Sequence, residues 1–183
     1  MAQGSTVVGF EFQLSDVDRG IYQTLSFKVA RHPSETAVYL VTRVLAYALE
    51  HAEGIELTPG LASADEPALV IRDASGRLRA WIEVGTPDAA RLHRASKAAD
   101  RVAVYCHKDA EAWLRGLAGH DVHRSETIAL HRIDRDFVDA LADRLARRNA
   151  WSLSITERTL YLDIEGTEGD SLFGTVERLT WPG

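Results

Sequence analysis

The chain has 183 residues, of which 45% are hydrophobic and 26% are charged, and its formal net charge is −6. This length and apolar content suffice for one sizeable core, so we expect a single domain over residues 1–183. The acidic balance argues against a surface that coats nucleic acid broadly, although it leaves room for a local basic cleft. The lone cysteine, Cys106, excludes a disulfide within the chain and favours a reducing compartment.

Membrane and export signals are not found in the sequence. The apolar run from Ala37 to Leu49 is interrupted by Arg43 and is shorter than the roughly 20 residues of a membrane helix. The chain does not open with a basic region followed by an apolar one, so we expect no secretory signal. We therefore expect a cytoplasmic protein of bacterial type without a membrane partner.

A hairpin and a helix are predicted at the start of the chain. Residues Thr6 to Leu14 and Ile21 to Ala30 alternate in the manner of strands and are separated by turn residues. Pro33 suits the first position of a helix, and Glu35 would then lie in the first turn, where the helix dipole favours a carboxylate. Apolar residues at helical spacing predict that this helix continues to about His51.

A second hairpin and a crossover helix are predicted in the middle of the chain. The turn Ala74-Ser75-Gly76 would fold residues Leu78 to Val84 back onto Ala68 to Arg72. Thr86 is the expected N-cap of the next helix, and a strand from Arg101 to Cys106 follows. Because a strand, helix and strand in succession form a right-handed parallel crossover, this last strand should pair with the second strand of the hairpin.

The rest of the chain adds helices and strands at both margins of this centre. The expected helices cover Asp109 to Leu117 and Asp134 to Arg148, and the expected strands lie within Val122 to Leu130 and at Trp151 to Ile155, Thr159 to Ile164 and Ser171 to Leu179. The predicted fold class is therefore α/β, a single domain with a mixed central sheet flanked by helices. Residues 68–106 would form its centre, and the two terminal groups of strands would form its margins.

Acidic residues flank the central hairpin. The hairpin would bring Asp65 or Glu66, ahead of its first strand, beside Glu83 near the end of its second strand. Crowded carboxylates disfavour each other's ionised form unless a cation neutralises them. A hard divalent ion, Mg²⁺ or Mn²⁺, is therefore the expected cofactor, with Glu35 as a further ligand at the end of a buried helix face.

A basic strip follows the hairpin on the crossover helix. Arg91, Arg94 and Lys97 are spaced by three residues and would lie along one side of that helix. Hydrolysis of a phosphodiester needs a metal-bound water and a cation beside the phosphate, so the strip is a candidate phosphate-binding surface. Glu83, Lys97 and Arg94 are the candidate catalytic residues, although an arginine stays protonated and cannot act as a base.

Three separated motifs resemble one known family. They are Arg31-His32-Pro33-Ser34-Glu35-Thr36, Asp65-Glu66-Pro67, and Trp81-Ile82-Glu83-Val84-Gly85 followed by Pro87-Asp88. In this order, and over essentially the whole chain, they resemble the YaeQ family of small bacterial proteins of unestablished function. That family is placed in the PD-(D/E)XK nuclease-like superfamily. The resemblance thus implies the restriction-endonuclease-like fold, in which a helix, a hairpin, a crossover helix and a parallel strand surround a metal site.

The resemblance also assigns roles to single residues. Glu35 corresponds to the helix-borne acid, Asp65, or in second place Glu66, to the aspartate of the motif, and Glu83 to its second acid. Where the superfamily has a lysine two residues after the second acid, this chain has Gly85. The usual group that activates the attacking water is therefore missing from its place, and the basic strip is the candidate replacement.

Each candidate site residue also has a structural explanation. Glu35 would be favoured in the first turn of a helix by the helix dipole. The acids before Pro67 would stabilise a turn that leads into the following strand. The alternative for Glu83 is a salt bridge to Arg91 or Arg94, because buried carboxylates are rare unless paired or coordinating. The basic strip would then be a solvated helix face.

Two hypotheses for function follow from this set of residues. The first is a divalent-metal-binding protein of nuclease fold that acts on or binds nucleic acid. The second is a catalytically inactive nuclease fold that serves as a protein-binding or regulatory module, which Gly85 and the acidic composition favour.

Overall fold

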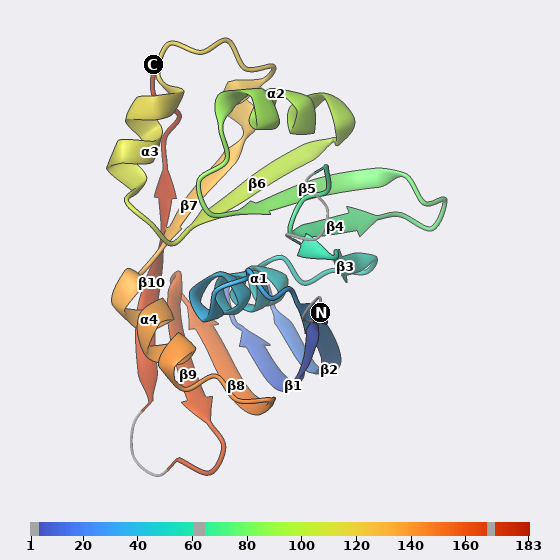
Figure 1. The fold of residues 1–183 in the computed structure, drawn as a ribbon, viewed down its shortest axis with the longest axis vertical. Helices are drawn as coiled ribbons and strands as arrows, with labels where there is room; N and C mark the ends of the chain where they lie inside the picture. The colour runs from blue at the N-terminus through green and yellow to red at the C-terminus, as the bar shows by residue number, and fades with distance from the viewer. Residues whose placement is uncertain (1–3, 61–64, 168–170) are drawn as a thin grey trace. The chain divides into compact units, whose positions relative to one another are not determined.

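The computed structural model describes residues 4–60, 65–167 and 171–183. The chain divides into two compact units, residues 1–41 with 133–176 and residues 42–132 with 177–183. Figure 1 shows the strands and helices of both units. Parallel and antiparallel strand pairs occur together with helices, so the predicted mixed α/β class is confirmed.

The strands of the first unit follow the order β2-β1-β8-β9-β10. Their bounds are Thr6–Asp16 for β1, Ile21–Arg31 for β2, Arg148–Thr156 for β8, Thr159–Ile164 for β9 and Leu172–Leu179 for β10, whose last three residues belong to the second unit. β1 pairs with β8 in parallel, and the pairs β2–β1, β8–β9 and β9–β10 are antiparallel. The expectation that the two terminal groups of strands form separate margins is wrong, because they pair with each other.

One face of this sheet is apolar and covered. Phe10 and Phe12 of β1 pack on Trp151 of β8, with ring centroids 5.2 Å and 6.0 Å apart. Helix α4 (Arg135–Asp143) packs on β10, where a Cβ on Gly174 would lie only 2.5 Å from Cβ of Phe137. The helix is shorter than predicted because the chain from Arg148 onward pairs with β1.

The strands of the second unit follow the order β7-β6-β5-β4-β3. Their bounds are Ile55–Leu57 for β3, Leu69–Arg72 for β4, Leu78–Val84 for β5, Arg101–Cys106 for β6 and Ala129–Ile133 for β7. β4 and β5 form the predicted antiparallel hairpin, and β5 and β6 form the predicted parallel pair. β6 and β7 are also parallel, so the predicted crossover is repeated once.

Two helices, α2 (Ala89–Ala98) and α3 (Ala110–Leu117), pack against one face of β5 and β6. Leu92 and Trp113 from these helices share a buried cluster with Val104 of β6. The N-cap of α2 is Asp88 rather than the predicted Thr86, since its carboxylate accepts the backbone N–H of Arg91 at 2.8 Å. A short 3₁₀ helix, Ser125–Thr127, occupies part of the predicted strand before β7.

Helix α1 (Ala37–Leu49) begins later than predicted. Thr36 accepts the backbone N–H of Tyr39 through its hydroxyl at 3.1 Å, so Thr36 starts the helix. Pro33 and Glu35 lie in the preceding turn, in which the N–H of Glu35 donates to the carbonyl of His32. Within the described ranges, no helix has both the length and the apolar character needed to cross a bilayer.

Candidate functional site

The carboxylate of Glu83 is buried near the end of β5 and is held by two donors. Glu83 is 3% exposed, and its Oε1 accepts a hydrogen bond from Nε1 of Trp81 and another from Nε of Arg91, both at 2.6 Å. Burial raises the pKa of the Glu83 carboxyl above its ordinary value, and the hydrogen bonds from Arg91 and Trp81 offset part of that rise. The salt bridge to Arg91 that the sequence suggested as an alternative is present.

Strand alternation and helix capping explain how these three side chains meet. Trp81 and Glu83 are two residues apart in β5 and therefore point to the same face. The Asp88 cap starts α2 so that Arg91 lies in its first turn, beside the end of the strand. Arg91 also donates from Nη2 to the backbone carbonyl of Glu66 at 2.7 Å. One guanidinium thus joins β5, α2 and the segment that precedes β4.

The two acids before β4 contact arginines of α2. Asp65 pairs with Arg94 at 3.3 Å, and the two side chains are 88% and 54% exposed. An ion pair so open to water contributes little to stability. Glu66 contributes its backbone carbonyl to Arg91, while its own side chain is exposed.

Lys97 lies at the far end of the basic strip. It is exposed in the last turn of α2, six residues after Arg91, which corresponds to about 9 Å along a helix axis. Arg91, rather than Lys97, is therefore the cation at the Glu83 carboxylate. The strip brings Arg91 and Arg94 to acidic partners and leaves Lys97 facing water.

These residues do not match the ligand set of a divalent metal. Mg²⁺ and Mn²⁺ take several oxygen ligands, commonly carboxylates. Here Oε1 of Glu83 already accepts two N–H donors, and Asp65 lies exposed beside a guanidinium. Within the part of the chain that the structure describes, no group of three or more His, Cys, Asp or Glu residues is arranged to hold a metal. The Mg²⁺ or Mn²⁺ site stays a prediction.

Comparison with known proteins identifies the family. Residues 1–171 match the family model described as YaeQ protein. This chain belongs to the YaeQ family. The resemblance seen in the three sequence motifs is thereby confirmed.

Curated YaeQ relatives match part of the chain. The chain is 33% identical over 115 residues to "Uncharacterized protein YaeQ" of Escherichia coli strain K12, and 32% identical over 115 residues to the protein of the same name from Salmonella typhi. In both, the match covers 62% of this chain and 64% of the relative's length.

Solved YaeQ structures match nearly the whole chain. The crystal structure of YaeQ protein from Pseudomonas syringae has a TM-score of 0.86 at 30% identity and covers 96% of each chain. The YaeQ protein from Xanthomonas axonopodis pv. citri has a TM-score of 0.84 at 28% identity, covering 97% of this chain and 99% of the other. The α/β fold is therefore that of the YaeQ family.

Glu35, which lies in one of the YaeQ-like motifs, is a second buried acid. It belongs to the first unit and is 1% exposed. Its Oε2 accepts the backbone N–H of His32 at 3.2 Å, and its carbonyl accepts Nε of Arg31 at 2.9 Å. The side chain thus closes the turn before α1. That Glu35 also joins Glu83 in one site stays a prediction.

Sequence reasoning missed a buried polar network on the other face of β6. Oε1 of Glu50, just after α1, accepts the hydroxyl of Tyr105 at 2.7 Å, and the same carboxylate pairs with Arg101. The ring of Tyr105 stacks on His131, with centroids 4.7 Å apart. Arg101 and Tyr105 are four residues apart in one strand and therefore share a face. This spacing of two polar residues was the feature of the sequence that could have predicted the network.

Proposed function

We propose that this YaeQ protein is a binding module on a restriction-endonuclease-like, PD-(D/E)XK fold whose catalytic centre is replaced by an ion pair. The observation that carries the proposal is the 2.6 Å contact between Nε of Arg91 and Oε1 of Glu83. A guanidinium in this position neutralises the acid that a nuclease would offer to a metal. We propose that the partner is a protein and that the two bind each other in the cytoplasm.

The order of elements supports the nuclease-like ancestry. Helix α1 and the short strand β3 are followed by the hairpin β4–β5, the crossover helix α2 and the parallel strand β6. Apart from β3, this is the arrangement that the superfamily resemblance implies. Glu83 lies in the second strand of that hairpin, and Gly85 stands two residues later with a φ of +95°. A lysine at position 85 would have to adopt a backbone conformation that favours glycine.

The chemistry of arginine explains why an ion pair differs from a metal centre. A bound divalent ion lowers the pKa of a ligated water and bridges phosphate oxygens. A guanidinium has no site for a water ligand and stays protonated, so it neither generates hydroxide nor accepts a proton. The Glu83–Arg91 pair therefore stabilises the packing of α2 on β5 without supplying a nucleophile.

Calorimetric titration with Mn²⁺ tests the proposal directly. Wild type, Glu83→Gln and Arg91→Met should all give the same weak, non-saturating heats. Arg91 already neutralises Glu83 in wild type, Asp65 pairs with Arg94 in water, and in Arg91→Met a single buried carboxylate is not a full ligand set for Mn²⁺. Arg94→Met is the matched control for removing a cation from α2. A saturable heat in wild type that disappears in Glu83→Gln would refute the binding-module proposal.

A second candidate function is a metal-dependent protein acting on or binding nucleic acid. It is favoured by the exposed Arg94 near the buried Glu83 carboxylate, whose pKa is raised by burial, because shifted pKa values gather at functional sites. Lys97 continues the basic strip along α2. Labelled single- and double-stranded DNA and RNA, incubated with Mn²⁺, provide the test. Cleavage that is lost in Glu83→Gln and kept in Glu56→Gln, an exposed acid of β3, would support this candidate.

A further inference from the structure

The uncovered face of the first unit's sheet carries a line of exposed aromatic side chains. Tyr22, Tyr161 and Phe173 are 62%, 48% and 72% exposed. Strand register places Tyr22 opposite Ser15, Ser15 opposite Ser154, Ser154 opposite Tyr161, and Tyr161 opposite Phe173. These five residues, one from each strand, form a single line across the sheet, here called the aromatic row.

The aromatic row has large side chains at both ends and small serine side chains in the middle. Neighbouring strands lie about 4.8 Å apart, so Tyr22 and Tyr161 are separated by roughly 14 Å, with only two serines between them. Exposed aromatic side chains gathered on one face are characteristic of interaction surfaces. The aromatic side chains therefore lie on both sides of the two serines, which is a suitable arrangement for binding an extended peptide chain.

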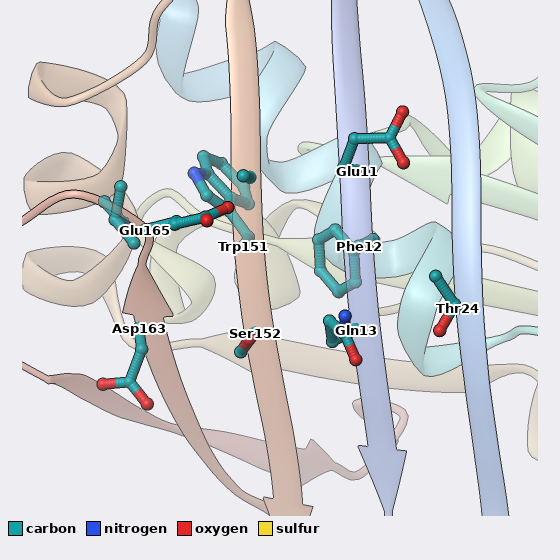
Figure 2. A pocket seen from close by; sticks show the side chains of 10 residues that line it. Glu11, Phe12, Gln13, Thr24, Trp151, Ser152, Asp163 and Glu165 are labelled. Atoms are coloured by element: carbon teal, nitrogen blue, oxygen red, sulfur yellow. The ribbon is translucent and has the colours of Figure 1, made fainter.

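A cavity of about 390 Å³ lies beside the aromatic row on the same sheet. Figure 2 shows its polar side chains on neighbouring strands. The residues that define this acidic pocket are Glu11, Gln13, Thr24, Ser152, Asp163 and Glu165. Among the described residues that line it, three carry carboxylates and none is a lysine, arginine or histidine. The pocket is therefore matched in charge to a cation.

Among the described residues, the side-chain partners of Glu11 and Asp163 are the neutral hydroxyls of Ser26 and Ser171. Glu11 accepts the hydroxyl of Ser26 at 2.7 Å, and such a donor orients a carboxylate without neutralising it. The basic residues Lys28 and Arg148 lie one row beyond Glu11, opposite Gly9. The face thus presents three bands in order, aromatic, acidic and basic.

We propose that this face docks an extended basic peptide segment of a partner protein. The inference deepens and rests on the proposed binding-module function, because it names the surface and the chemistry of the partner. Lysine or arginine side chains of the peptide occupy the acidic pocket, and an apolar side chain packs against Tyr161 and Phe173. Charge complementarity selects this occupant, since nucleic acid phosphates or a second copy with a net charge of −6 would be repelled.

The spacing of the bands predicts the sequence of the peptide. The bands cover four successive rows of β1: the aromatic row at Ser15, two acidic rows at Gln13 and Glu11, and the basic row at Gly9. Successive rows are two residues apart along the strand, which corresponds to about 6.8 Å. An extended peptide repeats side chains on one face at the same interval. The preferred ligand therefore has an apolar residue followed by basic residues at every second position.

Fluorescence anisotropy with a labelled synthetic peptide, Leu-Ser-Lys-Ser-Lys, tests the proposal at low ionic strength. The pocket variant combines Glu11→Gln, Asp163→Asn and Glu165→Gln. Its matched control combines Glu53→Gln, Glu56→Gln and Glu126→Gln, which remove the same charge from exposed positions of the second unit. We expect the Kd to rise roughly tenfold in the pocket variant and less than about twofold in the control.

Two further comparisons examine the aromatic band and the folding of the variants. Phe173→Ser should weaken binding several-fold, and the rearranged peptide Lys-Lys-Leu-Ser-Ser should bind more weakly to wild type than the alternating one. If circular dichroism shows that the triple variant is unfolded, the single substitution Glu165→Gln at an exposed position replaces it. A smaller loss of affinity in the same direction is then expected.

Several outcomes would overturn the inference. Equal losses in the pocket and control variants would mean that net charge alone attracts the peptide. Full competition by spermine, together with indifference to peptide order, would indicate a small-cation site. A dimer in sedimentation that Phe173→Ser dissociates would make the face a self-interface. None of these results changes the Mn²⁺ titration, so a failure of the docking site is distinguishable from a failure of the proposed function.

Discussion

Nε of Arg91 lies 2.6 Å from Oε1 of Glu83 and joins the first turn of α2 to the end of β5. The side chain of Glu83 is 4% exposed and that of Arg91 is 25% exposed, so solvent screens the pair poorly. Removing Arg91 therefore leaves the buried Glu83 carboxylate without its counter-charge, which costs more than the loss of a surface ion pair.

Arg91→Met is predicted to destabilise the protein. The substitution keeps an unbranched apolar side chain and leaves the buried Glu83 carboxylate unpaired, so we expect the free energy of unfolding to fall by about 3 kcal/mol. Urea denaturation measures this change. Arg94→Met is the control, because its pair with Asp65 is exposed and should contribute less than about 1 kcal/mol. Equal losses in the two variants would contradict a special role for Arg91.

The pH dependence of stability should report the ionisation of Glu83. Burial raises its pKa above the ordinary value of 4.5, so the protonated form is favoured more in the folded than in the unfolded protein. That contribution is complete below the unfolded pKa and is lost as the pH rises through the folded one. The stability of wild type relative to Glu83→Gln should therefore fall as the pH is raised from about 4. Urea titrations over a pH series, with Glu56→Gln as the unchanged reference, measure this trend.

Local sequence patterns predicted most helices and strands. They did not predict which distant strands pair with each other. The turn at Ala74-Ser75-Gly76 and the alternation around it identified the β4–β5 hairpin, and crossover handedness identified its parallel neighbour β6. The pairing of β1 with β8 places Gly9 opposite Arg148, and the side-chain amide of Asn149 donates to the carbonyl of Gly9, 140 positions away along the chain. Nothing local in either strand specifies the other.

The predicted start of α1 was wrong for a different physical reason. Pro33 and Thr36 are both suitable near a helix N-terminus, and propensity alone does not rank them. The hydroxyl of Thr36 caps α1, and this leaves Glu35 to close a turn instead of lying on the helix. A shift of one helical turn changed the surroundings of a candidate site residue.

The candidate site was predictable as a neighbourhood but not as a set of contacts. Sequence spacing placed Glu83, Arg91 and the acids before Pro67 around one helix end, and these residues do lie there. Whether carboxylates meet each other or meet arginines depends on side-chain direction, which spacing does not determine. The aromatic row was hidden for another reason, because it appears only when the register of five strands is known.

Gly174→Ala should destabilise the packing of α4 on β10. An added Cβ would lie 2.5 Å from Cβ and 2.6 Å from Cγ of Phe137, so the helix or the strand must shift. Overpacking of this kind costs about 1–3 kcal/mol. Gly116→Ala is the control, since that glycine lies inside α3 and an added Cβ would meet nothing within 4 Å outside its chain neighbours and the helix's own backbone. Alanine there should stabilise by up to about 1 kcal/mol. Thermal unfolding should show a lower midpoint for Gly174→Ala and a higher midpoint for Gly116→Ala than for wild type.

Asp18 should stabilise the turn between β8 and β9 in a pH-dependent way. Its carboxylate accepts the backbone N–H of Glu157 at 2.7 Å and of Arg158 at 3.0 Å, two residues whose φ values of +49° and +61° lie in the left-handed region. The hydrogen bonds from Arg158 and Glu157 lower the pKa of Asp18 below its ordinary value of 3.8. Because the folded pKa is the lower one, the stabilisation is present above the unfolded pKa and is lost as the pH falls through the folded pKa.

Asp18→Ala should accordingly lower the midpoint of thermal unfolding at neutral pH, and the difference from wild type should shrink as the pH falls below about 4. Asp121→Ala, a substitution of another exposed aspartate, should show no comparable trend. Differential scanning calorimetry across this pH range measures both differences. A gap between Asp18→Ala and wild type that stays constant down to low pH would mean that the turn is held by its backbone conformation and not by the Asp18 carboxylate.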